Sequence, residues 1–251
     1  MPGISLRVNG HVARLTLNRP NVLNALSPDV LTELVALCRE LNENESVRVV
    51  ILDGAGQHFS AGADLPEFSK RLDSAPDATA DLGRQATEAL ASIPQISIAA
   101  IKGYCVGGGV VLSAMCDMRI AADDARFSIP ELDAGIPLSW GAKPHVVRLF
   151  GEAVANDLVL TCRRFGADDA LGYGFLSRVI PVDEFDSVVD EIAEGIASKP
   201  ALVLRQTKRK LKDIRAGRFE PRDDARDMLD AMADKEATSV RDDYVRKNLG
   251  Q

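Results

Sequence analysis

Hydrophobic and polar positions alternate at the start of the chain with the two-residue period of a β-strand. Ile4, Leu6 and Val8 alternate with polar residues up to an Asn-Gly dipeptide, and a second apolar run follows it. Asn-Gly between two such runs is typical of a tight β-hairpin. Ser27 and Pro28 then precede apolar residues at helical spacing, which predicts a helix that begins there.

Strands and helices alternate as far as Pro181. The pattern predicts a strand at 47–52, a helix at 77–92 and another strand at 96–101 that leads into a glycine-rich segment. This order is typical of an α/β protein with a buried, largely parallel sheet. After Pro181 the strand signals disappear, and residues 183–246 are predicted to form three helices.

The predicted division of the chain follows the same change of pattern. We expect an α/β core at 1–182 and a C-terminal helical region at 183–251, with no low-complexity linker between them. One stretch of the tail carries an apolar stripe on an otherwise charged helix, and such a stripe needs a cover. Its residues are Met228, Leu229, Met232 and Val240. The pattern alone does not decide between the protein's own core and a neighbouring subunit.

Composition and charge exclude several classes of protein. The net charge of −7 argues against nucleic acid as the main partner, because phosphate binding needs surplus Lys and Arg. The four cysteines have no C-x-x-C spacing and the three histidines are scattered, so no metal site is predicted. No signal-peptide pattern opens the chain, and no apolar run approaches ~18 residues. We therefore expect a soluble cytoplasmic protein that does not enter a membrane.

Two glycine-bearing segments supply the candidate chemistry. HFSAGADL at 58–65 and GYCVGGG at 103–109 each follow a β-like apolar run. Small residues let a carbonyl approach the main chain closely, and a backbone N–H from each segment can donate to one oxygen. We predict that the N–H groups of Ala63 and Gly108 form an oxyanion hole. A helix that begins near Gly108 would direct its positive end to the same oxygen.

Other motifs with similar residues fit less well. Val-Val-Leu follows the triple glycine, whereas a Walker loop requires Lys followed by Ser or Thr. A dinucleotide-binding loop would need different glycine phasing and an acidic residue about twenty positions further on. Ser60 and Ser113 lack the G-x-S-x-G elbow of serine hydrolases. Asp64 and Asp117 lie beside the glycine segments, where an Asp more often binds nearby backbone N–H groups than takes part in catalysis.

The segment FSIPELDAG at 127–135 adds one carboxyl group, that of Glu131, beside the predicted hole. Together the three segments resemble the crotonase superfamily of acyl-CoA enzymes, the enoyl-CoA hydratase/isomerase family. The resemblance implies a spiral of repeated β-β-α turns with a C-terminal helical annex, a homotrimer or dimer of trimers, and an acyl-CoA thioester as substrate. CoA is then part of the substrate, and no separate cofactor is expected. The implied CoA-binding residues are Val22, Ala25, Ala61, Asp64, Leu65 and Pro66.

One position departs from the hydratases of that superfamily, which carry a second glutamate where Val111 stands. Two carboxylates can hold a water molecule and add it to a double bond, whereas one suffices to remove a proton and return it two carbons away. The resemblance therefore implies double-bond isomerisation with Glu131 as acid and base. Ser139 and Trp140 replace part of a glycine-rich loop, and with Val111 they would line and narrow the acyl pocket.

Alternatives remain open. The same scaffold serves hydration, or hydrolysis of a ring or thioester in a bulky acyl-CoA, and the missing glutamate is also compatible with a non-catalytic acyl-CoA-binding protein. Asp133 would raise the pKa of Glu131 if the backbone between them were extended, and would point elsewhere if it were helical. Basic residues of the tail offer contacts for CoA phosphates or form a solvated face. They are Arg205, Lys208, Arg209, Lys210, Lys212 and Arg215.

Overall fold

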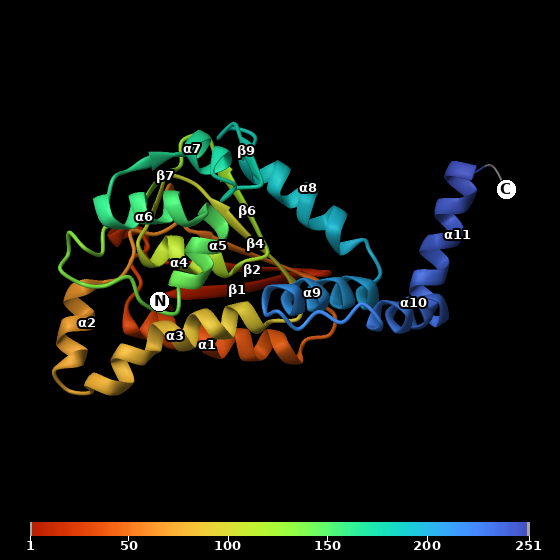
Figure 1. Ribbon diagram of the computed structural model, residues 1–251, viewed down its shortest axis with the longest axis horizontal. Helices are drawn as coiled ribbons and strands as arrows, with labels where there is room; N and C mark the ends of the chain where they lie inside the picture. The colour runs from red at the N-terminus through yellow and green to blue at the C-terminus, as the bar shows by residue number, and fades with distance from the viewer. Residues whose placement is uncertain (1, 250–251) are drawn as a thin grey trace.

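The computed structural model describes residues 2–249 and has an α/β architecture (Figure 1). Its large sheet runs in the order β1-β2-β3-β4-β6-β9, with an antiparallel β1–β2 hairpin and parallel pairing elsewhere. The strands are β1 (Ile4–Asn9), β2 (Val12–Leu17), β3 (Val49–Gly54), β4 (Ile96–Ile101), β6 (Met118–Ala122) and β9 (Arg178–Ile180). The predicted hairpin and the largely parallel sheet are confirmed.

A second, smaller sheet has the order β5-β7-β8. Its strands are β5 (Tyr104–Val106), β7 (Arg126–Ser128) and β8 (Phe165–Gly166). The chain passes from a strand of the large sheet to one of the small sheet and then into a helix. It does so in β4, β5 and α4 (Gly108–Met115), and again in β6, β7 and α5 (Lys143–Phe150). These are turns of the β-β-α spiral that the resemblance implied.

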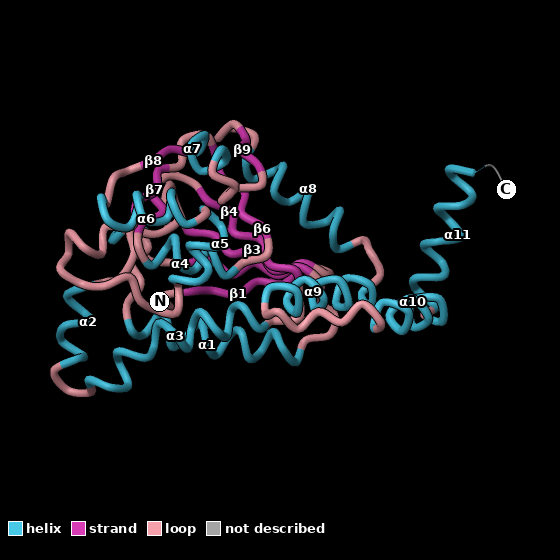
Figure 2. Tube along the Cα trace, viewed as in Figure 1, coloured by secondary structure: helices cyan, strands magenta, loops and turns pink. Residues whose placement is uncertain are grey.

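Both faces of the large sheet are covered, because its central strands are apolar on both sides. Val50 and Leu52 of β3 belong to one hydrophobic cluster, with side chains of α1 (Pro28–Glu43) and α3 (Pro76–Ser92). The alternate residues Val49 and Ile51 belong to a second cluster, with side chains of α8 (Phe185–Ala197). Successive side chains of a strand face opposite sides, so one apolar run serves two cores. Figure 2 shows the strands between α8 and the α1/α3 pair.

The helix starts follow local chemistry. Ser27 caps α1 as predicted, because its hydroxyl accepts a hydrogen bond from the N–H of Val30 at 3.3 Å and Pro28 occupies the first turn. The remaining helices are η1 (Pro20–Val22), α2 (Leu65–Leu72), α6 (Glu152–Thr161), α7 (Ala167–Gly172), α9 (Ala201–Arg215), α10 (Asp223–Ala233) and α11 (Lys235–Leu249).

The tail from α8 onward has four helices, so the expectation of three is wrong. Asp234 has an extended backbone (φ −72°, ψ 131°) and ends α10. Its carboxylate accepts a hydrogen bond from the N–H of Ala237 at 2.8 Å, which starts α11. One charged stretch therefore holds two helices, separated at an aspartate that the sequence pattern does not distinguish from its acidic neighbours.

The last two helices extend away from the body of the molecule (Figure 1). Met228, Leu229 and Met232 of the apolar stripe are 63%, 66% and 51% exposed, so no described part of the chain covers them. In contrast, α8 contributes Phe185 and Val189 to the second hydrophobic cluster. The proposed boundary near residue 182 stays a prediction.

Candidate active site

The two glycine-bearing segments lie side by side at the carboxyl ends of β3 and β4. The N–H of Ser60 donates to the carbonyl of Tyr104 at 2.9 Å, and the N–H of Val106 donates to the carbonyl of Ser60 at 3.0 Å. Gly62 has a left-handed backbone (φ +90°), and a Cβ there would lie 2.8 Å from the carbonyl oxygen of Val106. Only glycine allows the segments to approach this closely.

The N–H groups of Ala63 and Gly108 are left without acceptors. In the parallel bridge between Leu26 and Ala63, the N–H of Leu26 donates to the carbonyl of Gly62 at 2.8 Å, and the N–H of Asp64 donates to the carbonyl of Leu26 at 3.0 Å. This bridge does not use the N–H of Ala63. Gly108 opens α4, so its N–H precedes the first intrahelical hydrogen bond. Within residues 2–249, no hydrogen bond uses either N–H. Two free donors from adjacent segments are what a developing oxyanion requires.

Glu131 is the carboxyl group next to these donors. A Cβ on Gly107 would lie 3.0 Å from Oε1 of Glu131, and Gly107 immediately precedes the donor Gly108. The other oxygen, Oε2, is buried and has no hydrogen-bond partner among the described residues. Burial raises the pKa of Glu131, and a hydrogen bond from its own backbone opposes this only in part. Such a carboxyl group is suited to accept and return a proton.

No second carboxyl group stands where the hydratases have one. Val111 is buried in α4, and α4 contains no acidic residue. Asp133 does not replace it: residues 131–135 form turns, with the N–H of Ala134 bonded to the carbonyl of Pro130 at 3.1 Å, and Asp133 is exposed. The backbone between Glu131 and Asp133 is therefore not extended, and their side chains diverge.

Trp140 lies against the oxyanion donor Gly108. A Cβ on Gly108 would be 2.5 Å from Cζ3 of Trp140, and a Cβ on Gly83 of α3 would overlap the opposite edge of the same indole. The backbone of Trp140 is left-handed (φ +57°), which is uncommon for a bulky residue. Thr87 holds this conformation by donating to the carbonyl of Trp140 at 2.9 Å. The neighbouring Ser139 is exposed.

The residues implied in CoA binding gather around Arg19, which the sequence analysis missed. Its guanidinium donates to the carbonyl of Ala25 at 2.7 Å and to the carboxylate of Asp64 at 2.8 Å. Asp64 also caps α2 by accepting from the N–H of Glu67 at 3.4 Å, so its contacts are structural. No local motif marks Arg19, because the contacts reach as far as 45 positions along the chain.

The other implied residues are accessible near this ion pair. Val22 and Leu65 are 46% and 45% exposed, and Pro66 is exposed beside them. Ala61 lines a cavity of about 330 Å³ together with Val106 and Pro130, which flank the oxyanion donor and Glu131 in sequence. The structure thus brings apolar surface to the candidate site from segments that are distant in sequence.

The basic residues of the tail do not act as one group. Lys208 is buried and pairs with Asp117 at 2.8 Å, while Asp117 also accepts from the N–H of Ser97. Arg209 and Lys210 form ion pairs with acidic residues of α10. Lys212 and Arg215 line a separate cavity with residues of α5.

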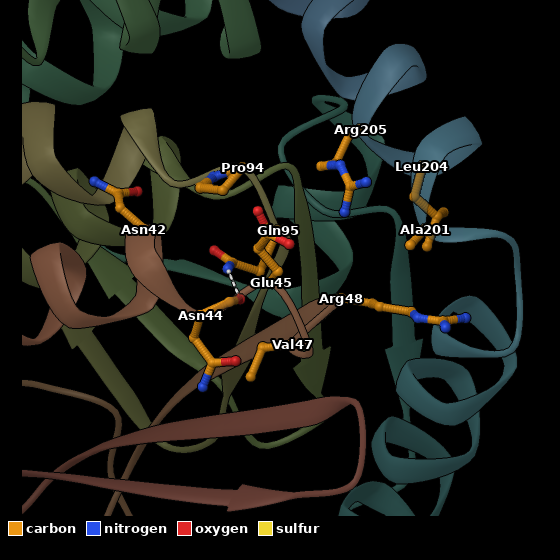
Figure 3. A pocket seen from close by; sticks show the side chains of 10 residues that line it. All are labelled: Asn42, Asn44, Glu45, Val47, Arg48, Pro94, Gln95, Ala201, Leu204 and Arg205. Carbon is orange, nitrogen blue, oxygen red and sulfur yellow. Dashed lines mark hydrogen bonds between the residues drawn. The ribbon is translucent and has the colours of Figure 1, made fainter. Parts of the chain in front are cut away.

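Arg205 lines a different hollow, between the end of α1 and the starts of β3, β4 and α9 (Figure 3). In it, Gln95 donates to the carbonyl of Asn44 at 3.2 Å. The amino ends of β3 and β4 lie here, at the edge of the sheet opposite to the two glycine-bearing segments. Arg205 is therefore remote from the candidate site.

Metal and thiol chemistry find no support in the described part of the chain. Residues 2–249 contain no group of three or more His, Cys, Asp or Glu side chains placed to hold a metal ion. The four cysteines are buried free thiols, and burial raises the pKa of Cys38 and of Cys116 to about 12. None of the helices in that part is long and apolar enough to cross a membrane.

The spiral fold and the paired N–H groups define a crotonase-like α/β enzyme. The chain belongs to the enoyl-CoA hydratase/isomerase family, which it matches over residues 7–244.

Relatives in this family have different named reactions. The chain is 37% identical over 197 residues to a probable enoyl-CoA hydratase of Mycobacterium bovis, covering 78% of this chain and 76% of the relative. It is also 37% identical over 219 residues to the peroxisomal Δ(3,5)-Δ(2,4)-dienoyl-CoA isomerase of Arabidopsis thaliana, covering 82% and 78%. The crystal structure of a putative family member from Hyphomonas neptunium has a TM-score of 0.89 at 27% identity, covering 98% and 95%. The family is therefore established, and the names leave the reaction undecided.

Proposed function

We propose that the protein isomerises a double bond in an acyl-CoA thioester, with Glu131 as the single acid and base. The observation that carries this proposal is the buried, unpartnered Oε2 of Glu131 beside the free N–H of Gly108. A buried polar atom without a partner is costly, and a substrate proton would satisfy it.

The reaction follows from the two kinds of group. The N–H groups of Ala63 and Gly108 donate to the thioester oxygen, and the positive end of α4 adds to their effect. Glu131 removes a proton from C2 of a 3-enoyl thioester, and negative charge develops on that oxygen. The same carboxyl group returns the proton to C4, so the double bond moves to C2–C3 without loss or gain of atoms.

The raised pKa of Glu131 supports both halves of this reaction. A carboxylate stabilised by strong partners would be a weak base, whereas a desolvated one accepts a proton more readily. A protein that only bound acyl-CoA would have no need of a carboxyl group that is costly to bury. Hydration is the second candidate, favoured by the names of several relatives, but Val111 provides no group to hold or activate water.

We further infer that the acyl pocket is compact. The indole of Trp140 occupies the space between Gly83 and Gly108, directly beside the oxyanion donor. An acyl group bound there contacts the indole before it extends further. This supports short unsaturated acyl groups over long or bulky ones.

We also propose that the exposed stripe of α10 and α11 packs on a second copy of the chain, in a homotrimer or a dimer of trimers. Met228, Leu229 and Met232 are each at least 51% exposed, and apolar area of this kind is usually covered. Sedimentation of the wild type and of Leu229→Asp, which places a charge on this face, measures the assembly. A monomeric wild type contradicts this inference.

The substitution Glu131→Gln tests the reaction. Gln keeps the shape of the side chain but cannot carry the proton, so isomerisation of a short 3-enoyl-CoA should fall by at least about 10²-fold while binding is retained. Turnover is followed by the absorbance of the conjugated product, and binding by calorimetry with a saturated acyl-CoA.

Asp133→Asn is the matched control, since it removes an exposed carboxyl group two residues away. It should leave turnover unchanged. Equal loss of binding and turnover in Glu131→Gln would indicate a structural glutamate, and a wild type that hydrates 2-enoyl-CoA faster than it isomerises would favour the second candidate.

A further inference from the structure

A cavity of about 310 Å³ lies at the C-terminal end of α4, the end opposite to Gly108. Its apolar wall consists of Ala91 at the end of α3 and Ala114 and Met115 at the end of α4. Gly108 and Met115 are the first and last of the eight residues of α4, and at a rise of ~1.5 Å per residue the cavity end of the helix is about 10 Å from the oxyanion donor Gly108. The two places are therefore separate sites that share one helix.

Basic side chains from two helices converge on this cavity. His145 and Arg148 come from α5, and Lys212 and Arg215 come from α9. These helices are more than fifty positions apart in sequence, so the cluster is made by the tertiary fold rather than by a local run of charge.

The positive charge of the cavity is not balanced by nearby carboxylates. Asp117 lies 3.7 Å from Nη2 of Arg215, but it already pairs with the buried Lys208 at 2.8 Å. Arg148 and Lys212 form no ion pair with any acidic residue within 2–249. The basic groups consequently outnumber the single shared carboxylate.

Burial, and to a smaller extent repulsion between the basic groups, lowers the pKa values around this cavity. Burial, followed by the charges of Arg148, Arg215 and Arg119, lowers the pKa of His145. Burial and the charge of Arg215 lower the pKa of Arg148. Burial also lowers the pKa of Arg119, which donates to the backbone carbonyls of Phe175 and Cys116. An anion in the cavity would relieve this repulsion.

We propose that this cavity binds a small oxyanion of the phosphate class, held by Arg148, Lys212 and Arg215 with His145 as a further donor. Guanidinium groups match phosphate oxygens in a bidentate manner, and a Lys adds a compact charge. Free inorganic phosphate and a phosphate group of CoA offer the same chemistry. The proposal does not depend on the isomerase reaction, because binding is measured without turnover.

Titration of the wild type with inorganic phosphate, against chloride at matched ionic strength, tests the site. Calorimetry and thermal unfolding should both show saturable binding. Arg148→Gln combined with Lys212→Gln should weaken binding by at least about tenfold, since charge-assisted hydrogen bonds are the strong ones. Arg39→Gln is the control, because Arg39 is an exposed residue of α1 that forms no ion pair within residues 2–249; this variant should bind phosphate as the wild type does. The proposal is overturned if the wild type does not bind phosphate, or if the double variant binds phosphate as strongly as the wild type does.

His145 supplies a second readout that does not depend on the stability of variants. Phosphate should raise its pKa, because an anion favours the imidazolium form. Proton NMR of the three histidines resolves this shift, and His145→Gln identifies the resonance. A histidine signal that titrates identically with and without phosphate contradicts the site.

A third measurement separates the two sources of the anion. If the group is a phosphate of CoA, saturating CoA should abolish the response to inorganic phosphate. The double variant should then bind CoA about tenfold or more weakly. Pantetheine, which carries no phosphate group, should not compete with inorganic phosphate. If the ligand is free phosphate, CoA and phosphate should bind additively. Either result supports the oxyanion site and assigns its occupant.

Discussion

The two ends of α4 present different groups to a negatively charged ligand: backbone N–H groups at one end and basic side chains at the other. At the N-terminal end, free backbone N–H groups and one buried carboxyl group surround Gly108, and the nearest bulky side chain is the indole of Trp140. At the C-terminal end, basic side chains line a cavity. The first end suits charge that develops during a reaction, because its N–H donors are already oriented toward the oxygen on which that charge appears. The second suits an anion that carries its charge before it arrives.

The same contrast appears in the titrating groups at each end. Burial raises the pKa of Glu131 and lowers the pKa of His145, since in both cases it disfavours the charged form. A raised pKa makes the carboxyl group of Glu131 a better base, and a lowered pKa favours the neutral form of His145. The N-terminal end of α4 is therefore suited to proton transfer, and the C-terminal end to binding of an anion.

The largest expected effect tests the donors of the N-terminal end. Gly108→Pro removes one N–H at a helix position where proline is tolerated, and turnover should fall on the order of 10²-fold or more. Steady-state kinetics on a short 3-enoyl-CoA measures it, with circular dichroism to confirm folding.

Gly108→Ala is the matched control for that substitution. Its Cβ crowds Trp140 as the proline does, but it keeps the N–H. If alanine and proline reduce turnover equally, crowding explains the loss and the oxyanion assignment fails.

A second prediction introduces charge into the apolar face of α4. Val111→Glu supplies the carboxyl group that the hydratases have, and hydration of crotonyl-CoA should rise at least about tenfold, a modest share of what a positioned acid or base contributes. The ratio of hydration to isomerisation measures the change. Val111→Gln, of similar size but without a proton to transfer, should not raise hydration. A folded glutamate variant no faster than the wild type would contradict the single-carboxylate explanation.

A third prediction concerns the indole beside the donors. Trp140→Gly removes it and suits the left-handed backbone at this position. The ratio of turnover on 3-decenoyl-CoA to that on 3-hexenoyl-CoA should rise about fivefold or more, since each buried methylene then contributes to binding. Ser139→Ala, at the exposed neighbour, should leave the ratio unchanged. An unaltered ratio in the glycine variant means that the indole does not limit the acyl group.

The smallest expected effect is a difference in pH dependence between the two ends. Between 4.5 and its raised pKa, Glu131 holds more proton in the folded than in the unfolded protein, so it destabilises the fold increasingly as pH rises. Glu131→Gln should therefore gain in Tm over the wild type above pH 4.5, on the order of a few °C.

His145 has the opposite sign. Its folded pKa lies below 6.5, so the stability it contributes is present above that pH and is lost as pH falls through the folded pKa. His145→Gln should gain over the wild type only on acidification. Differential scanning calorimetry across pH 4 to 8 measures the difference in Tm between each variant and the wild type. If this difference changes with pH in the same direction for both variants, the contrast between the two ends of α4 is contradicted.

Much of the core was predictable because its signals are local. The Asn-Gly hairpin, the Ser27 cap and the strand at 96–101 each depend on a few adjacent residues, and the structure contains all three. The tail was less predictable. Asp234 divides it through one side-chain hydrogen bond, and no periodicity in the surrounding charged sequence marks that residue.

The sequence by itself determined the chemical groups of the candidate site: the glycine-bearing segments, the single Glu131 and the valine at 111. Only the tertiary structure decided what each of them can do. It placed the segments in contact, left two N–H groups free, buried one oxygen of Glu131 without a partner and inserted Trp140 between Gly83 and Gly108. It also brought α5 and α9 together into a basic cavity that neither helix specifies alone. Residue types follow from local sequence, whereas burial, free donors and uncompensated charge arise only from packing between segments that are far apart in the chain.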